Sequence, residues 1–209
     1  MTELLVRPPS LHTALPEATQ APPWAALLVP FYQRLGRALP PMARLHSKEI
    51  RQPYRRLLVH SDDMTPTLEE FYGGPLRLKV LGSECSADTY QREVVLELES
   101  SHRPVEYGAI GIHLQHLPDE ARRIVLEEGH PFGRILQSEA IAHLSWPQAF
   151  VSVRGDAHMS RLLGSKNSAV LYGRRNVVVD GHRRLLADVV EILAPVPEAL
   201  SHPHENQGC

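Results

Sequence analysis

The sequence has little cysteine and no long apolar run. Cys85 and Cys209 are its only cysteines, and Cys209 is the last of the 209 residues. One pair with a terminal member is not a disulfide framework, so we expect a protein of the reducing cytoplasm. No apolar stretch approaches the roughly 18 residues that a membrane helix needs. The first residues also lack the basic and apolar regions of a signal peptide. We therefore predict no membrane partner.

The sequence also lacks an excess of charge and the common cofactor motifs. Its 22 Lys and Arg residues nearly balance its 24 Asp and Glu residues, so nucleic acid is not a predicted partner. Phosphate-binding loops, dinucleotide fingerprints and nucleophile elbows do not occur. Twelve histidines are present, but the three-residue spacing of His113 and His116 near a predicted strand end does not guarantee convergence on a metal. We predict no metal and no cofactor.

Proline is concentrated at the N-terminal end. Eight of the 18 prolines lie within the first 41 residues. We interpret residues 1–45 as a Pro-rich arm with a short helix from Trp24 to Leu39, interrupted at Pro30. Residues 46–195 form the predicted domain, and residues 196–209 a flexible tail. The length suits one domain with a sizeable core.

Alternating apolar and polar residues predict an antiparallel sheet between the arm and the tail. The predicted strands are 75–81, 90–99, 105–114, 149–153, 169–179 and 182–193. Helices are predicted at 118–128 and from 133 to about 143. Asp180-Gly181, between the last two strands, is the strongest hairpin signal in the chain. Hairpins with helices collected between them indicate the α+β class.

Two charged residues stand on apolar strand faces. Arg92 shares its predicted face with Tyr90, Val94, Leu96 and Leu98; Glu191 shares its face with Leu185, Ala187, Val189 and Leu193. Such residues are almost never buried unpaired, because desolvating a charge costs roughly several kcal/mol. Arg92 and Glu191 are therefore candidates for a polar-ligand site inside an apolar pocket. A buried structural ion pair is the alternative.

Four segments carry a family resemblance in their order along the chain. Residues 57–69 contain Asp62-Asp63-Met64-Thr65, a turn before a helix that Asp63 or Thr65 caps. Residues 90–96 contain Arg-Glu-Val, residues 130–136 contain Pro-Phe-Gly-Arg, and residues 172–191 begin with Tyr-Gly-Arg-Arg. With these motifs, roughly His46 to Leu193 resembles the chorismate pyruvate-lyase family, including its actinobacterial and archaeal relatives.

The resemblance implies a fold, an activity and a site. The implied fold is a chorismate-lyase-like antiparallel sheet with helices packed on it and a buried ligand pocket. The family eliminates pyruvate from chorismate to give 4-hydroxybenzoate without a cofactor. Its arginine matching Arg92 holds the ring carboxylate, with backbone at the position of Met64. Its glutamate matching Glu191 bonds the opposite oxygen, with backbone at the position of Phe132. Gly108 matches a pocket glycine that leaves room for the ring.

The residue types suit this chemistry. A guanidinium grips a carboxylate with two parallel hydrogen bonds, and aromatisation makes the elimination downhill, so the enzyme mainly orients and stabilises charge. Glu191 could bond the ether oxygen when protonated, or accept from the product hydroxyl when ionised. Arg174 and Arg175 point to opposite faces of a regular strand, so one could reach the second carboxylate, although exposed adjacent arginines are usually solvated. Gly108 could equally be a packing glycine, and Met64 a core residue.

We therefore predict a carbon–oxygen lyase acting on a small-molecule carboxylate, with two alternatives open. Phe132 stands where the family commonly has leucine, and the arm and the segment around 155–166 lie outside the better-known bacterial form. These departures could suit the fold to a different carboxylated ring. The other alternative is a non-catalytic small-acid-sensing module, since effector domains of some bacterial regulators share this fold. The Pro-rich arm shows no helix-turn-helix pattern, which argues against that role. The sequence carries no signal for an oligomeric state.

Overall fold

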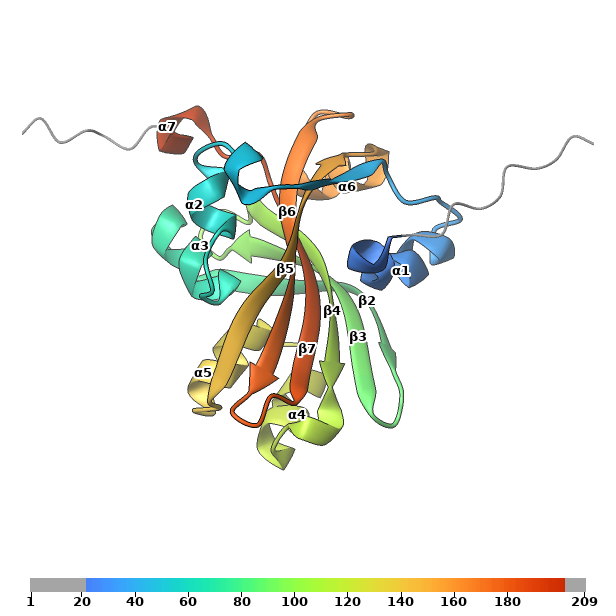
Figure 1. The fold of residues 1–209 in the computed structure, drawn as a ribbon, viewed down its shortest axis with the longest axis vertical. Helices are drawn as coiled ribbons and strands as arrows, with labels where there is room; N and C mark the ends of the chain where they lie inside the picture. The colour runs from blue at the N-terminus through green and yellow to red at the C-terminus, as the bar shows by residue number, and fades with distance from the viewer. Residues whose placement is uncertain (1–21, 202–209) are drawn as a thin grey trace, which may run out of the picture.

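One antiparallel sheet organises the protein, for which a computed structural model describes residues 22–201. The sheet has seven strands in the order β1-β5-β6-β7-β4-β3-β2 (Figure 1). The strands are β1 Met42–Leu45, β2 Leu76–Cys85, β3 Thr89–Leu98, β4 Pro104–His113, β5 His143–Arg154, β6 Val170–Asp180 and β7 Leu185–Leu193. This architecture confirms the expected α+β class and the expected hairpins of β3 with β4 and of β6 with β7.

Short helices connect and cover the strands. They are η1 Pro23–Leu28, α1 Val29–Arg34, η2 Ser47–Glu49, α2 Tyr54–Leu58, α3 Met64–Tyr72, η3 Leu114–His116, α4 Asp119–Leu126, α5 Phe132–Ser138, α6 Ala157–Leu163 and α7 Glu198–Ser201. In Figure 1, α2 and α3 lie to one side of the bent sheet and α1 to the other, with α4 and α5 near its lower end. None of the helices between residues 22 and 201 combines the length and apolarity needed to cross a membrane.

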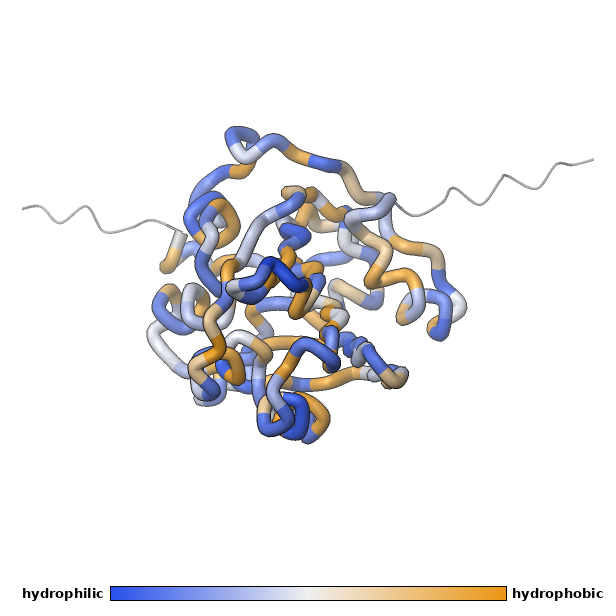
Figure 2. The backbone as a smooth tube through the Cα atoms, turned by 60° about the horizontal axis from the view of Figure 1, so that its bottom comes forward, coloured by the Kyte–Doolittle hydropathy of each residue, from blue (hydrophilic) through white to orange (hydrophobic). Residues whose placement is uncertain are grey.

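Both faces of the central strands β3, β4 and β7 are buried over most of their length. Successive strand residues point to opposite faces, so Tyr107 and Val190 pack in a cluster with Leu28 and Met159, while Ile110 packs on the other face. Apolar and polar residues accordingly alternate over short stretches of the chain (Figure 2). On β3, even the more polar side is covered, since Glu93 is 6% exposed and accepts a hydrogen bond from the Tyr107 hydroxyl at 2.6 Å.

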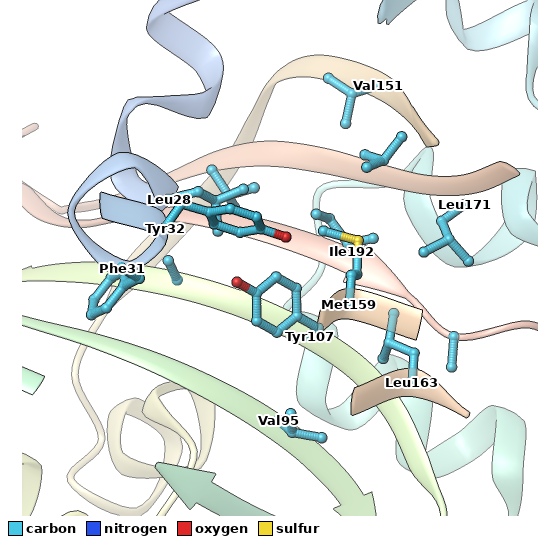
Figure 3. Close-up of a cluster of buried hydrophobic side chains, with 14 residues drawn as sticks. Leu28, Phe31, Tyr32, Val95, Tyr107, Val151, Met159, Leu163, Leu171 and Ile192 are labelled. Carbon is cyan, nitrogen blue, oxygen red and sulfur yellow. The ribbon is translucent and has the colours of Figure 1, made fainter. Parts of the chain in front are cut away.

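The N-terminal segment belongs to this core. Leu28 and Tyr32 are buried, and they lie with Tyr107 between η1, α1 and the sheet (Figure 3). β1 pairs with β5, so the sheet already begins at Met42, ahead of the expected boundary at residue 46. The expected helix from Trp24 to Leu39 ends at Arg34 and changes from 3-10 to α-helix just before Pro30. The rest of the predicted arm, residues 1–21, and the end of the predicted tail lie outside the described residues.

The end of the helix expected at 133–143 and the start of the strand that follows it were also predicted wrongly. The helix expected from 133 to about 143 ends at Ser138, and β5 begins at His143, six residues before the expected start at 149. Ala140 has φ of 50°, which a helix cannot continue through. The segment around 155–166 forms α6, capped by Asp156, whose side chain accepts from the Met159 amide at 2.8 Å.

Candidate functional site

A cavity of about 70 Å³ lies between the sheet and the N-terminal ends of α3 and α5. Side chains of β3, β4, β6 and β7 form its floor, and Met64 and Phe132, the first residues of α3 and α5, line its walls. A buried water needs about 10–15 Å³. The cavity therefore has room for a small organic molecule.

Arg92 lines this cavity and is only 1% exposed. Its Nη2 donates to the His130 carbonyl at 3.1 Å, while its buried Nε and Nη1 have no hydrogen-bond partner among residues 22–201. Burial lowers the pKa of Arg92, and the nearby Tyr90 and Glu128 oppose that effect by raising it. Two buried donors of the guanidinium thus have no hydrogen-bond partner in the described chain, and the Tyr90 ring, with its centroid 6.0 Å from Arg92 Cζ, lies beside them.

Glu191 lines the same cavity but is held by another arginine. Arg174 Nε donates to Glu191 Oε2 at 2.5 Å, and the two residues are cross-strand partners on β6 and β7. Arg174 is fully buried and also donates to the carbonyls of Leu58 at 3.3 Å and His60 at 3.1 Å. The structure therefore brings Arg92 and Glu191 to one cavity without pairing them, and the ion pair is between Glu191 and Arg174.

Glu106 is a cavity residue that our sequence reasoning missed. It precedes Gly108 by two residues on β4 and so lies on the same face. Its Oε2 is buried and finds no partner within the described part of the chain. Burial and then the charge of Glu191 raise the pKa of Glu106 well above its ordinary value, although Arg174 lowers it. Glu106 thus keeps its proton to a higher pH than an exposed glutamate. Strand alternation, which singled out Arg92, could have found it.

Gly108 lies at the cavity floor opposite Glu191, its partner on β7. A Cβ at this position would be 2.5 Å from the Val190 carbonyl oxygen. Real Cβ atoms essentially never approach so closely, so the absence of a side chain at Gly108 allows β4 and β7 to approach each other here. Gly108 lies next to the cavity, and its expected role in making room for a ring stays a prediction.

The two adjacent arginines of β6 occupy opposite faces. Arg174 lies on the cavity face but is occupied by Glu191 and by backbone carbonyls, and it is not among the residues that line the cavity. Arg175 forms two hydrogen bonds with Asp188, at 2.9 and 2.6 Å, and does not line the cavity either. The structure therefore places neither arginine in direct reach of a ligand there.

A polar chain that the sequence did not reveal closes one wall of the cavity. Asp63 precedes α3, but its carboxylate caps no helical amide; it takes a hydrogen bond from Ser145 Oγ at 2.7 Å and lies 2.7 Å from His143 Nε2. Burial alone would raise the pKa of Asp63, but the hydrogen bonds of His143 and Ser145 hold it below its ordinary value. The same bond raises the pKa of His143 against partial burial. Asn176 extends the chain, with Nδ2 3.4 Å from Ser145 Oγ.

The described residues contain no group of three His, Cys, Asp or Glu side chains that could hold a metal ion. The rings of His113 and His116 stack with centroids 5.9 Å apart, and His116 Nδ1 lies 2.8 Å from the Leu185 carbonyl.

Comparison with known proteins yields solved structures but no family. No family model and no curated protein match the sequence. PhnF from Mycobacterium smegmatis matches with 14% identity and a TM-score of 0.49, over 65% of this chain and 65% of its own, so less than two thirds of PhnF is spanned. The effector domain of PhnF matches with 15% identity and a TM-score of 0.48, over 63% and 88% of the two chains.

A transcriptional regulator of the GntR family from Bacillus cereus matches with 14% identity and a TM-score of 0.42, over 57% of this chain and 92% of its own. Similarity at these values carries no argument about activity, and no family model or curated protein supports membership of the chorismate pyruvate-lyase family. The lyase activity stays a prediction.

Proposed function

We propose that this domain binds a small organic carboxylate in the cavity, with Arg92 as the group that holds the carboxylate. The observation that carries the proposal is the pair of buried N–H donors on Arg92, Nε and Nη1, without a partner in the described chain. A buried unpaired charge is costly, and an Arg–carboxylate pair can satisfy two parallel N–H donors at once. A bound carboxylate would complete both hydrogen bonds and neutralise the charge.

The other groups of the cavity limit which acid fits. Glu191 already carries an ion pair with Arg174, and Glu106 is a buried carboxyl whose pKa is raised well above normal. A second negative charge on the ligand near the Glu191 carboxylate would be repelled, and the neighbouring cation, Arg174, is already paired. The remaining walls are largely apolar, with Val94, Ile110 and Val189 among them. These features favour a monocarboxylate with an apolar body.

The proposal requires only that the domain binds the carboxylate without converting it, as a small-acid-sensing module does. Isothermal titration calorimetry with benzoate tests it, and methyl benzoate is the uncharged control ligand. We expect benzoate to bind, methyl benzoate to bind far more weakly, and Arg92→Leu to weaken benzoate binding at least about 30-fold, because losing one partner of a buried charge pair costs about 2–5 kcal/mol.

Arg56→Leu is the matched control variant. Arg56 lies on α2 with a 61% exposed side chain paired to Glu70, whose side chain is 79% exposed, so the loss of Arg56 removes the same charge away from the cavity. The proposal is contradicted if both variants bind benzoate as the wild type does.

A second candidate function is the carbon–oxygen lyase reaction on chorismate, and Glu106 is the observation that favours it. A carboxyl that keeps its proton inside the cavity could donate it to the ether oxygen as the bond between that oxygen and the ring breaks, while the ring carbon that bears the hydroxyl group loses its proton to water and the released enolpyruvate tautomerises to pyruvate. Glu191 would orient the opposite side of the ring. Incubation with chorismate, with pyruvate measured by a coupled dehydrogenase, tests this candidate. Pyruvate release that is lost in Glu106→Gln would support it, and a wild type that releases no pyruvate above background would leave binding alone.

A further inference from the structure

Asn176 is a second polar residue of the cavity with an atom that lacks a partner. It lies on β6, is 2% exposed and lines the cavity. Its Nδ2 donates to Ser145 Oγ at 3.4 Å, while its buried Oδ1 has no hydrogen-bond partner in the chain from residue 22 to 201. Buried amide oxygens are nearly always satisfied in folded proteins. An unsatisfied one beside a cavity indicates that a ligand supplies the donor.

The polar chain beside Asn176 fixes which end of its amide is turned toward Ser145. The Ser145 hydroxyl has one proton, and it donates that proton to Asp63 Oδ1 at 2.7 Å. The Asp63 carboxylate, whose pKa is held below normal by His143 and Ser145, can only accept. Ser145 Oγ is therefore left as an acceptor toward Asn176, which must present Nδ2 to it. The oxygen of the amide consequently faces away from Ser145.

Arg92 and Asn176 stand at the two ends of one row of the sheet. Arg92 pairs with Ile110, Ile110 with Val189, and Val189 with Asn176 across β3, β4, β7 and β6. Three strand spacings would place the two end Cα atoms about 14 Å apart on a flat sheet. Ile110 and Val189 form an apolar floor between them. A ligand lying along this row would meet a cation at one end and a hydrogen-bond acceptor at the other.

We propose that Asn176 is a specificity-determining residue, which accepts a hydrogen bond from a hydroxyl or amino group at the end of the ligand remote from its carboxylate. This inference rests on the proposed carboxylate site at Arg92. The ligand class is then a small ring acid with a donor substituent, and an acid without the donor leaves the buried Oδ1 unpaired. Such a mismatch weakens binding by roughly 10-fold or more.

The test is a comparison of dissociation constants for benzoate, 3-hydroxybenzoate and 4-hydroxybenzoate by calorimetry. In the wild type we expect the better hydroxybenzoate isomer to bind about 10-fold tighter than benzoate. In Asn176→Leu, which has a similar volume and no acceptor, that ratio should fall to about one. Val178→Ala is the matched control: Val178 lines the cavity on the same face of β6, and its truncation should change the affinities for all three acids by a similar factor.

The outcomes separate this inference from the proposed function. A wild type that binds none of the three acids overturns both. Benzoate binding without a preference for either hydroxybenzoate, or a preference that survives in Asn176→Leu, overturns the role of Asn176 and leaves the carboxylate site standing. Thermal melts check that each variant is folded. If Asn176→Leu does not fold, Asn176→Ser, whose side chain is too short to reach the ligand, is judged by the same ratio.

Discussion

Two buried arginines of this protein stand in opposite electrostatic situations. Arg174 is fully buried with an ion pair to Glu191 and hydrogen bonds to three backbone carbonyls, of Leu58, His60 and Asp62. Arg92 is just as buried, yet its Nε and Nη1 are unpaired in the described chain. The contacts of Arg174 join β6 and β7 to the segment before α3. The unpaired donors of Arg92 instead lower the stability of the protein in the absence of a ligand. Strain of this kind is typical of binding sites.

Replacing each arginine by methionine should therefore change stability in opposite directions. Arg92→Met removes an uncompensated buried charge, so we expect the free energy of unfolding without ligand to rise by roughly 1–4 kcal/mol. Arg174→Met leaves Glu191 unpaired, so the free energy of unfolding should fall by roughly 3–5 kcal/mol in this variant. Urea denaturation followed by circular dichroism measures both values. Equal losses in the two variants would mean that Arg92 is a structural residue and would contradict its assignment to a ligand.

A substitution at Gly108 can distinguish a role in strand packing from a role in making room for a ligand. An alanine Cβ there would meet the Val190 carbonyl at 2.5 Å, a backbone atom that cannot swing aside. We expect Gly108→Ala to reduce the free energy of unfolding by about 1–3 kcal/mol or more. Gly111→Ala is the control on the same strand, because its Cβ would meet only side-chain atoms, of Leu27 at 3.3 Å and of Gln91 at 3.7 Å. A Gly108→Ala protein of full stability that no longer binds benzoate would instead favour the role of making room for a ring.

At the scale of elements, the start of α3 is tied to β5 by Asp63 and its two partners, His143 and Ser145. This tie makes one wall of the cavity depend on the protonation of two groups. Asp63 has a lowered pKa in the folded protein, so its contribution to stability is present above its unfolded pKa and is lost as the pH falls through the folded value. His143 has a raised pKa, so its contribution is present below its unfolded pKa and is lost as the pH rises through the folded value.

The tie should consequently be strongest in mildly acidic solution. We expect His143→Gln to destabilise the protein most near pH 5, between the ordinary pKa values of about 3.9 and 6.5 for the two groups. The difference from the wild type should shrink as the pH rises through the raised pKa of His143 in the folded protein, because the imidazole then loses its charge. Denaturation curves at pH 5, 6.5 and 8 measure it, with the exposed His182→Gln as the control. A difference that stayed constant with pH would show that His143 acts by packing alone.

Period-two alternation predicted β3, β4, β6 and β7 closely, and it also located Arg92 and Glu191 at the cavity. It failed where exposed apolar residues break the alternation or where the local conformation changes. The predicted strand at 149–153 was shorter than β5, because the exposed apolar residues Leu144 and Trp146 interrupt the alternation. The positive φ of Ala140, which ends the preceding helix, has no sequence signal.

Glu106 lies on the same strand face as Gly108, and Asn176 on the same face as Arg174. That Glu106 Oε2 and Asn176 Oδ1 lack hydrogen-bond partners depends on contacts between segments far apart in the sequence, which the sequence does not show.

At the scale of the whole molecule, the cavity lies on one face of the central strands and the N-terminal segment packs on the opposite face of the same strands. On β4, Glu106 and Gly108 face the cavity, whereas Tyr107 between them packs with Leu28 and Tyr32 on the other face (Figure 3). Neither side of β4 is exposed to solvent over this stretch. The segment from η1 to β1 is thus required to bury the back of the strands that carry the site, although its composition suggested an arm.

This arrangement predicts a single cooperative unit that includes the N-terminal segment. Leu28 is fully buried, so Leu28→Ala should cost roughly 2–5 kcal/mol, while Leu35→Ala, at a residue 44% exposed, should cost far less. The two tryptophans, Trp24 in η1 and Trp146 on β5, report on both ends of the structure. Single-tryptophan proteins made by Trp24→Phe and Trp146→Phe should give the same urea midpoint, and Leu28→Ala should shift both by the same amount, because the two regions unfold together. If the Trp24 signal were lost at lower urea than the Trp146 signal, the N-terminal segment would be a separate unit that can leave the sheet.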